Sequence, residues 1–181
     1  MAPEPRRKLD YSYIQATPND GKRYELVDGE LLVNPAPTPI HQRVSRRLQR
    51  QLEDYFHARN LGEVFDAPLD VILTPHDVFE PDLLVVADPS HISARAIEKP
   101  PLLVVEILSP STRRVDRGLK FRRYAVLGVQ HCWIIDPDEK RVECFRLAAD
   151  AFAPVVDAEG NTTLRHPDWD DLVIDLTALW R

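Results

Sequence analysis

Apolar residues after the proline-rich stretch 34–40 recur with the period of an α-helix. The arginines of the same segment fall off this apolar stripe, as expected of a helix with one buried and one solvated face. The sequence therefore predicts an amphipathic helix. Its buried stripe consists of Val44, Leu48, Leu52, Tyr55 and Phe56.

Elsewhere the apolar positions follow a period of two or form short continuous runs. Residues 24–33 indicate two short strands around Asp28-Gly29, a dipeptide typical of tight hairpins. From Val64 to Thr74 apolar and polar residues alternate, which predicts a strand. The continuous apolar runs 82–87 and 102–108 are typical of central strands that are covered on both faces.

A second helix and two further strands follow. Residues 109–112 predict a turn with a helix N-cap, and the helix is expected to end at about Leu127, before Gly128. Strands around Trp133 and Val142 come next, and the apolar end 171–181 is expected to dock on the body.

The resulting order is hairpin, helix, three strands, helix, two strands. It predicts an α/β or α+β fold, with one sheet and helices packed on it. A chain of 181 residues favours one domain. We expect that domain to span residues 24–181, after an N-terminal lead-in of residues 1–23.

Composition narrows the class of protein. Hydrophobic residues make up 44% and charged residues 29%, which argues against disorder. There is no apolar run of membrane-spanning length and no apolar secretory segment near the start, so we expect a cytoplasmic protein without a membrane partner. Cys132 and Cys144 are expected to lie opposite each other across a hairpin as reduced thiols without a function.

A net charge of −6 argues at first against a nucleic-acid partner. The charge is uneven, however. Residues 41–60 hold five arginines against two acids, and residues 111–123 hold six basic residues against one acid. These segments could form a basic face, or they could be solvated helix faces, and charge alone favours the second alternative. The candidate backbone-binding residues are Arg43, Arg46, Arg47, Arg50, Arg113, Arg114 and Arg117.

Two carboxylates lie in the apolar strands. Asp82 opens the first central strand, and Glu106 lies near the end of the next, where an unpaired charge is costly. Symmetric antiparallel pairing around the loop 88–100 places them opposite each other. A salt bridge to an arginine could neutralise them, but a hard divalent cation such as Mg²⁺ is favoured for two adjacent carboxylates.

Lys120 is the third candidate residue of this site. Asp116, Lys120 and Tyr124 share one face of the second helix, which begins soon after Glu106. The lysine could hold a phosphate or assist an attacking water. It could equally form an ion pair with Asp116, four residues earlier.

Several segments resemble one known family. They are PD(82)LLVV, LLVVE(106)ILSPST, D(116)RGLK(120)FRRY and GVQHCWIIDP, preceded by YELVDGELLVNPAP and by His41 in an arginine-bearing helix. Together they resemble the Uma-type restriction endonuclease family of the PD-(D/E)XK nuclease superfamily. The resemblance implies a restriction-endonuclease-like core. It also implies that Asp82 and Glu106 bind Mg²⁺ (or Mn²⁺).

The sequence departs from the superfamily at one position. The superfamily lysine stands two residues after the glutamate, where this chain has Leu108, and the resemblance makes Lys120 the matching residue. It also suggests Glu25 as an additional acidic residue, although an exposed hairpin glutamate is an equal alternative. His41 and Tyr124 could reach the site or could be structural.

The function implied is a metal-dependent endonuclease that hydrolyses DNA phosphodiester bonds. The low charge suggests weak non-specific affinity or a homodimer that doubles the basic face. One alternative is a catalytically inactive nucleic-acid-binding module on the same fold, and another is a protein-interaction domain. The fold alone does not separate the three.

Overall fold

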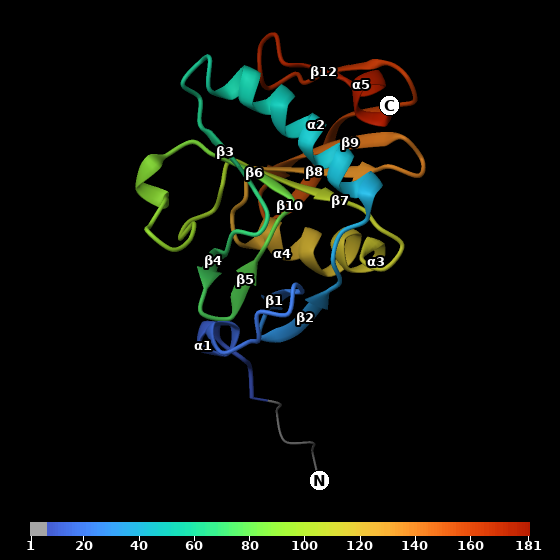
Figure 1. Cartoon of the computed structure of the whole chain (residues 1–181). Helices are drawn as coiled ribbons and strands as arrows, with labels where there is room; N and C mark the ends of the chain where they lie inside the picture. The colour runs from blue at the N-terminus through green and yellow to red at the C-terminus, as the bar shows by residue number, and fades with distance from the viewer. Residues whose placement is uncertain (1–6) are drawn as a thin grey trace.

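The computed structural model describes residues 7–181 and is built around a six-stranded mixed sheet (Figure 1). The strand order is β10-β9-β8-β7-β6-β3, in which only β7 and β8 are parallel neighbours. The fold class predicted from the sequence is thereby confirmed. The bounds of these strands are β3 Glu63–Asp66, β6 Leu83–Val86, β7 Leu103–Ile107, β8 His131–Asp136, β9 Arg141–Ala148 and β10 Ala151–Glu159.

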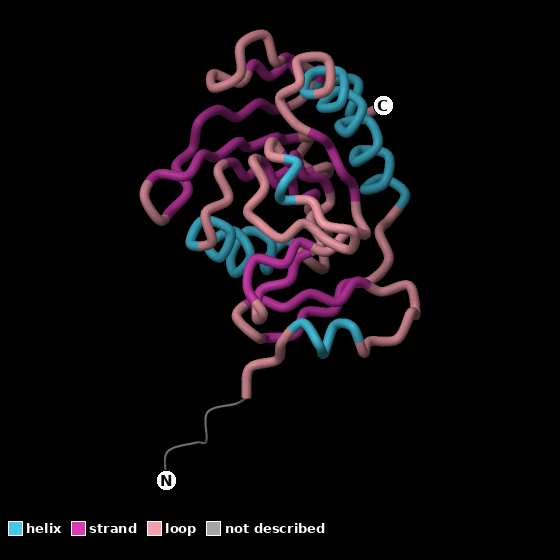
Figure 2. The backbone as a smooth tube through the Cα atoms, turned by 90° about the vertical axis from the view of Figure 1, so that its left-hand side faces the viewer, coloured by secondary structure: helices cyan, strands magenta, loops and turns pink. Residues whose placement is uncertain are grey.

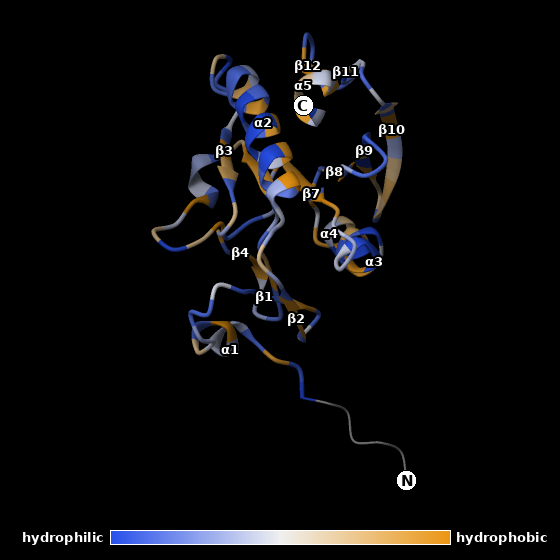
Figure 3. Cartoon of the chain, turned by 45° about the vertical axis from the view of Figure 1, so that its right-hand side comes forward, coloured by the Kyte–Doolittle hydropathy of each residue, from blue (hydrophilic) through white to orange (hydrophobic). Residues whose placement is uncertain are grey.

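Helix α2, Pro39–Phe56, covers one face of this sheet. It starts at the N-cap Thr38, whose side chain accepts the His41 N–H, with proline at the first helical position. All five residues of the predicted apolar stripe are buried, and the stripe packs on the sheet residues Leu103 and Val105. In Figure 3 the strand β7 is hydrophobic, whereas hydrophilic residues follow the outer side of α2.

The connection from β7 to β8 covers the other face. It runs through three consecutive helical segments, because parallel neighbours need a crossover. They are α3 Arg113–Val115, the π-helix η2 Asp116–Lys120 and α4 Phe121–Val126. Tyr124 packs there with Val104 and Ile134 in a second core cluster. Gly128 follows with φ +87°, as a helix-ending glycine should.

A second, four-stranded sheet lies beside the first, with the short helix α1, Tyr11–Gln15, against it (Figure 2). The predicted hairpin forms its β1–β2 pair, and Asp28 and Gly29 both take positive φ, the requirement of a tight type I′ turn. A side chain at Gly29 would also collide with Lys8. The strands are β1 Arg23–Val27, β2 Glu30–Asn34, β4 Val71–Thr74 and β5 Asp77–Phe79.

The chain ends in a small two-stranded sheet and a helix. Strands β11, Thr163–Arg165, and β12, Val173–Asp175, pair antiparallel, and α5, Leu176–Trp180, then packs against α2. Leu176 and Leu179 are buried, so the expected docking of the C-terminal segment is confirmed.

Two predictions about the strands were wrong. The alternating stretch after Val64 does not make one strand, because the chain turns at Ala67-Pro68 and contributes β3 to the large sheet and β4 to the small one. The cysteines do not face each other. Trp133 pairs with Cys144, and this offset by one residue places Cys132 and Cys144 on opposite faces of the sheet.

Other features bear on the remaining expectations. The first six residues of the predicted lead-in 1–23 lie outside the described residues. A short 3-10 helix, η1, Pro89–His91, lies in the loop between β6 and β7. Within residues 7–181, none of the helices combines the length and the apolar character needed to cross a bilayer.

Candidate active site

Asp82 and Glu106 lie on adjacent strands at the centre of the large sheet. Leu83 of β6 pairs with Val105 of β7, and this register, continued by one residue, brings Asp82 opposite Glu106, in agreement with the symmetric pairing. Both side chains are buried. The topology therefore places two carboxylates beside each other in the core.

Lys120 joins three carboxylates in the interior. Its Nζ lies 2.7 Å from Glu106 Oε1, 2.9 Å from Glu25 Oε1 and 3.7 Å from Asp116 Oδ1. Tyr124 donates its hydroxyl to Glu106 Oε1 at 2.6 Å. Four separate elements, β1, β7, η2 and α4, thus bring these five residues together. Lys120 forms the ion pair with Asp116 that the sequence suggested, and it also pairs with Glu106.

Asp82 is held by a different set of partners. His41 Nε2 lies 3.0 Å from Asp82 Oδ2, which also accepts the Ile107 N–H at 2.8 Å. Arg23 Nη1 lies 2.7 Å from Asp82 Oδ1. The structure therefore places His41 in the site rather than only at the start of α2.

Glu25 contacts Lys120 and two groups outside the Lys120 cluster, Asn34 and Glu80. It is fully buried, so it is not an exposed hairpin glutamate. Its Oε1 accepts the Glu80 N–H at 2.8 Å, and its Oε2 accepts the side-chain amide of Asn34. Glu80 itself has a buried Oε2 without a hydrogen-bond partner.

These groups carry more negative than positive charge. Among the described residues, five carboxylates gather around two side chains that carry a permanent positive charge, those of Arg23 and Lys120. The five are Glu25, Glu80, Asp82, Glu106 and Asp116.

The excess charge is reflected in the pKa values. Burial raises the pKa of Glu106 to about 8; the attraction of Lys120 opposes this rise, and the repulsion of Asp116 adds to it. Burial and the neighbouring Glu25 raise the pKa of Glu80 to about 7. Burial also opposes the charge of Lys120, but the three carboxylates hold its pKa well above its ordinary value. The cluster therefore favours additional positive charge.

The pKa of Asp82 is shifted in the opposite direction. Burial disfavours its ionised form, but the hydrogen bond from His41 and the charge of Arg23 lower its pKa to about 2. Asp82 is thus a carboxylate across the physiological range.

The donor set fits a hard divalent cation. Mg²⁺ prefers oxygen ligands and is bound by one or two carboxylates. Asp82 and Glu106 supply such oxygens, and the unpartnered Oε2 of Glu80 lies in the same acidic group. The residues present are consistent with a magnesium site.

A cavity of about 480 Å³ opens on the Asp82 side of the cluster. Of the three candidate catalytic residues, Asp82 is part of its lining, whereas Glu106 and Lys120 are not. The charged and histidine side chains of the lining are Lys22, Arg23, His41, Arg46, Asp66, Glu80 and Asp82.

The seven candidate arginines have different environments. Arg46 lines the cavity, and Arg43 and Arg50 are exposed on the same helix. Arg47 instead donates to the backbone carbonyls of Leu179 and Arg181.

The second basic segment is largely engaged within the protein. Arg113 forms a two-pronged ion pair with Asp136, and Arg117 pairs with Glu143. Arg114 is exposed.

Residues 10–176 match the model of the Uma2 family, described as putative restriction endonuclease. The chain belongs to the Uma2 family. This membership supports a nuclease function in general terms.

Two similar proteins extend the comparison. The Uma2 chain is 30% identical over 125 residues to an uncharacterized protein of Synechocystis, a match that covers 68% of this chain and 65% of that relative's length. A solved structure described as a putative nuclease belonging to DUF820, from Anabaena variabilis, superimposes with a TM-score of 0.76. The match covers 95% of this chain and 97% of the other. Because the two sequences are only 18% identical, the likeness establishes the fold alone.

Three residues of this Uma2 site were not found from the sequence. They are Arg23, Asn34 and Glu80, which contact Asp82 or Glu25. The sequence spacing could have identified two of them, Glu80 and Arg23. Side chains two residues apart in an extended segment share a face, so Glu80 could have been inferred from Asp82 and Arg23 from Glu25.

Proposed function

We propose that this Uma2-family protein is a Mg²⁺-dependent endonuclease that hydrolyses DNA phosphodiester bonds, with Mn²⁺ as a substitute metal. Asp82 and Glu106 are the proposed metal ligands and Lys120 the third catalytic residue. The observation that carries the proposal is the buried cluster in which carboxylates outnumber cations, next to a cavity that opens at Asp82.

A bound divalent cation would polarise the scissile phosphate and lower the pKa of a coordinated water. The residues of the chain prepare the site for it. His41, Arg23 and the Ile107 N–H keep Asp82 ionised and fix its orientation. The raised pKa of Lys120 keeps it protonated, so it acts as a fixed positive charge and not as a base.

The proposed substrate side of the site is the cavity lined by Lys22 and Arg46. The lining holds three basic and three acidic side chains, and Lys22 and Arg46 are the proposed contacts for phosphate oxygens of a nucleic-acid backbone. The exposed Arg43 and Arg50 extend the basic side of α2. Because the whole chain carries −6, binding is expected to be weak and strongly dependent on salt.

The test is cleavage of supercoiled and linear DNA with Mg²⁺ or Mn²⁺. We expect metal-dependent nicking by the wild type and its loss in Asp82→Asn and in Glu106→Gln, which keep the side-chain shape. Asp54→Asn, an exposed carboxylate on α2, is the matched control and should cleave normally. DNA binding without cleavage in every metal would instead favour the inactive binding module.

A further inference from the structure

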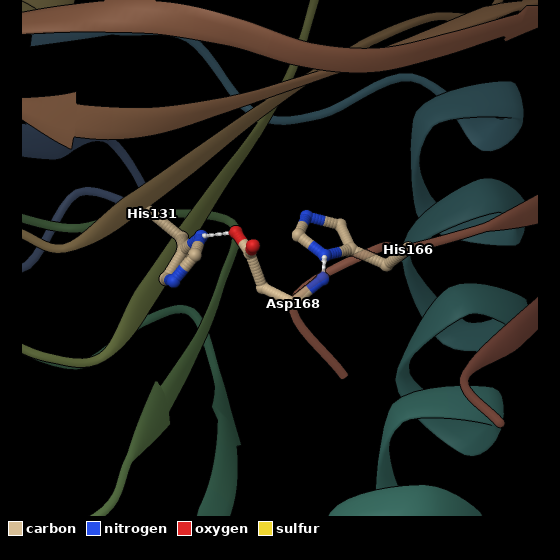
Figure 4. Close-up of side chains that lie close together, drawn as sticks. All are labelled: His131, His166 and Asp168. Carbon is tan, nitrogen blue, oxygen red and sulfur yellow. Dashed lines mark hydrogen bonds and ion pairs between the residues drawn. The ribbon is translucent and has the colours of Figure 1, made fainter. Parts of the chain in front are cut away.

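A second group of potential metal ligands lies outside the acidic site. His131, His166 and Asp168 each offer one ligand atom, and these three atoms lie within 4.8 Å of one another. Figure 4 shows the two imidazole rings on either side of the Asp168 carboxylate. His131 begins β8, whereas His166 and Asp168 lie in the turn between β11 and β12.

This group is separate from the acidic site. Leu103 pairs with His131 and Glu106 with Ile134, so the two groups are three residues apart along neighbouring strands, roughly 10 Å. They also lie on opposite faces of the sheet. His131 shares its face with Trp133, in the core beneath α2, while Glu106 shares its face with Val104.

Each residue of this group, and the neighbouring Trp133, has one buried polar atom without a hydrogen-bond partner. Seven buried side-chain nitrogen or oxygen atoms of residues 7–181 have no hydrogen-bond partner, and four of them lie here. Buried polar groups are almost always satisfied, so such a concentration indicates a missing ligand. The four atoms are His131 Nδ1, Trp133 Nε1, His166 Nε2 and Asp168 Oδ2.

The surroundings hold these side chains in place. Trp169 packs on both histidine rings, at centroid distances of 4.4 Å from His131 and 4.3 Å from His166. Arg146 pairs with Oδ1 of Asp168 at 2.5 Å, which leaves Oδ2 facing His131 at 3.9 Å from Nδ1.

We propose that His131, His166 and Asp168 bind a zinc ion. Two imidazoles and one carboxylate suit Zn²⁺ better than Mg²⁺, which prefers oxygen ligands alone. Tetrahedral coordination at 2.0–2.1 Å separates ligand atoms by about 3.3 Å, so each pair must approach by at most about 1.5 Å. Asp168 is 20% exposed, which leaves room for a water as the fourth ligand.

The ion would connect the turn between β11 and β12 to the first residue of β8. The proposed role is therefore structural, because it fixes the C-terminal segment to the central sheet. It does not depend on the nuclease proposal, since the ligand sets share no residue.

The test measures zinc binding by the full chain without an affinity tag. A chelator first removes any bound metal, and zinc is then added in the presence of excess Mg²⁺. Wild type should retain one Zn²⁺ per chain by mass spectrometry of the metal, and Co²⁺ should give the visible bands of a tetrahedral site. Zinc should also raise the melting temperature. His131→Gln, His166→Gln and Asp168→Asn should each weaken binding at least tenfold.

Two controls keep the result specific. His57→Gln removes an exposed histidine, and the double variant Asp82→Asn/Glu106→Gln removes the acidic site; both should keep the zinc. If a histidine variant does not fold, the zinc affinity of Asp168→Asn still tests the proposal, because Asp168 is partly exposed. The proposal is overturned if wild type binds no zinc, if Asp168→Asn binds it equally well, or if only the double variant loses it.

Discussion

The hydroxyl of Tyr124 donates to the same oxygen of Glu106 that Lys120 contacts, at 2.6 Å and 2.7 Å. One carboxylate oxygen is therefore held by a cation and a neutral donor, both buried, on successive turns of the crossover helix. The second oxygen of Glu106 is left for another ligand.

Removing the tyrosine hydroxyl should weaken the site without dismantling it. Tyr124→Phe deletes one buried hydrogen bond to Glu106, worth about 0.5–1.5 kcal/mol of folding free energy. Glu106 then becomes harder to ionise, so Mg²⁺ affinity should fall at neutral pH. Calorimetric titration and urea unfolding measure both effects. Unchanged affinity in a destabilised variant would mean that the hydrogen bond serves the fold alone.

The raised pKa of Glu106 predicts an unusual dependence of stability on pH. Its pKa is about 8 in the folded chain against 4.5 ordinarily, so between these values the folded state binds more protons than the unfolded state. Without metal, the free energy of unfolding contributed by Glu106 should fall as pH rises from about 4.5 to about 8. Thermal unfolding in a chelator should show this fall, and Glu106→Gln should flatten it. A wild-type slope equal to that of the variant contradicts the prediction.

Loss of the buried cation should be severe. Lys120→Met leaves Glu25, Glu106 and Asp116 without their shared partner, and breaking a buried ion pair in this way costs about 3–5 kcal/mol. Urea unfolding measures the loss. The double variant Lys120→Met/Glu106→Gln should recover part of the stability but no cleavage activity. Full activity in either variant would remove Lys120 from the catalytic proposal.

The two basic segments should respond differently to substitution. Arg46→Ala should weaken DNA binding and reduce the slope of log affinity against log salt by about 1, because one phosphate contact is lost. Arg113→Ala should instead lower stability, since Arg113 pairs with the buried Asp136. Binding isotherms at several salt concentrations distinguish the two. An equal change of slope in both variants would mean that Arg113 also contacts DNA.

The core beneath α2 gives a prediction independent of the site. Leu48 is fully buried, so Leu48→Ala should lower the free energy of unfolding by about 2–5 kcal/mol. Val126→Ala is the control, because Val126 is 61% exposed and should change stability little. Chemical denaturation of both variants makes the comparison. A small effect at Leu48 would mean that the core collapses around the shortened side chain.

Helix α2 and the central strands could be predicted because each carries a long or continuous apolar pattern. In the second sheet the β1–β2 hairpin could be predicted, but its pairing with β4 and β5 could not, since these strands are only four and three residues long and hold too few periods. The cysteine prediction failed because a shift of one residue in a hairpin reverses the face of every side chain.

Within the acidic site, Asp82 and Glu106 stood out as charges in apolar strands, and Lys120 was suggested by helical spacing and then matched by the family resemblance. Asn34 gave no signal, because an asparagine at the end of a hairpin strand is ordinary. The His131, His166 and Asp168 group could not be read from the sequence either. The turn that brings His166 and Asp168 to β8 is set by packing of the C-terminal sheet, not by a local motif.

The π-helical turn Asp116–Lys120 makes Lys120 sensitive to the length of the chain. Its wide turn accommodates one more residue than an α-helix would, and the backbone is anchored on both sides, by Arg113 on Asp136 and by Tyr124 on Glu106. Inserting one further residue beside Gly118 would rotate one anchor against the other by about 100°, whereas deleting one would give a regular α-helical turn. An insertion here would therefore move Lys120 away from its carboxylate partners even where every side chain of the site is retained.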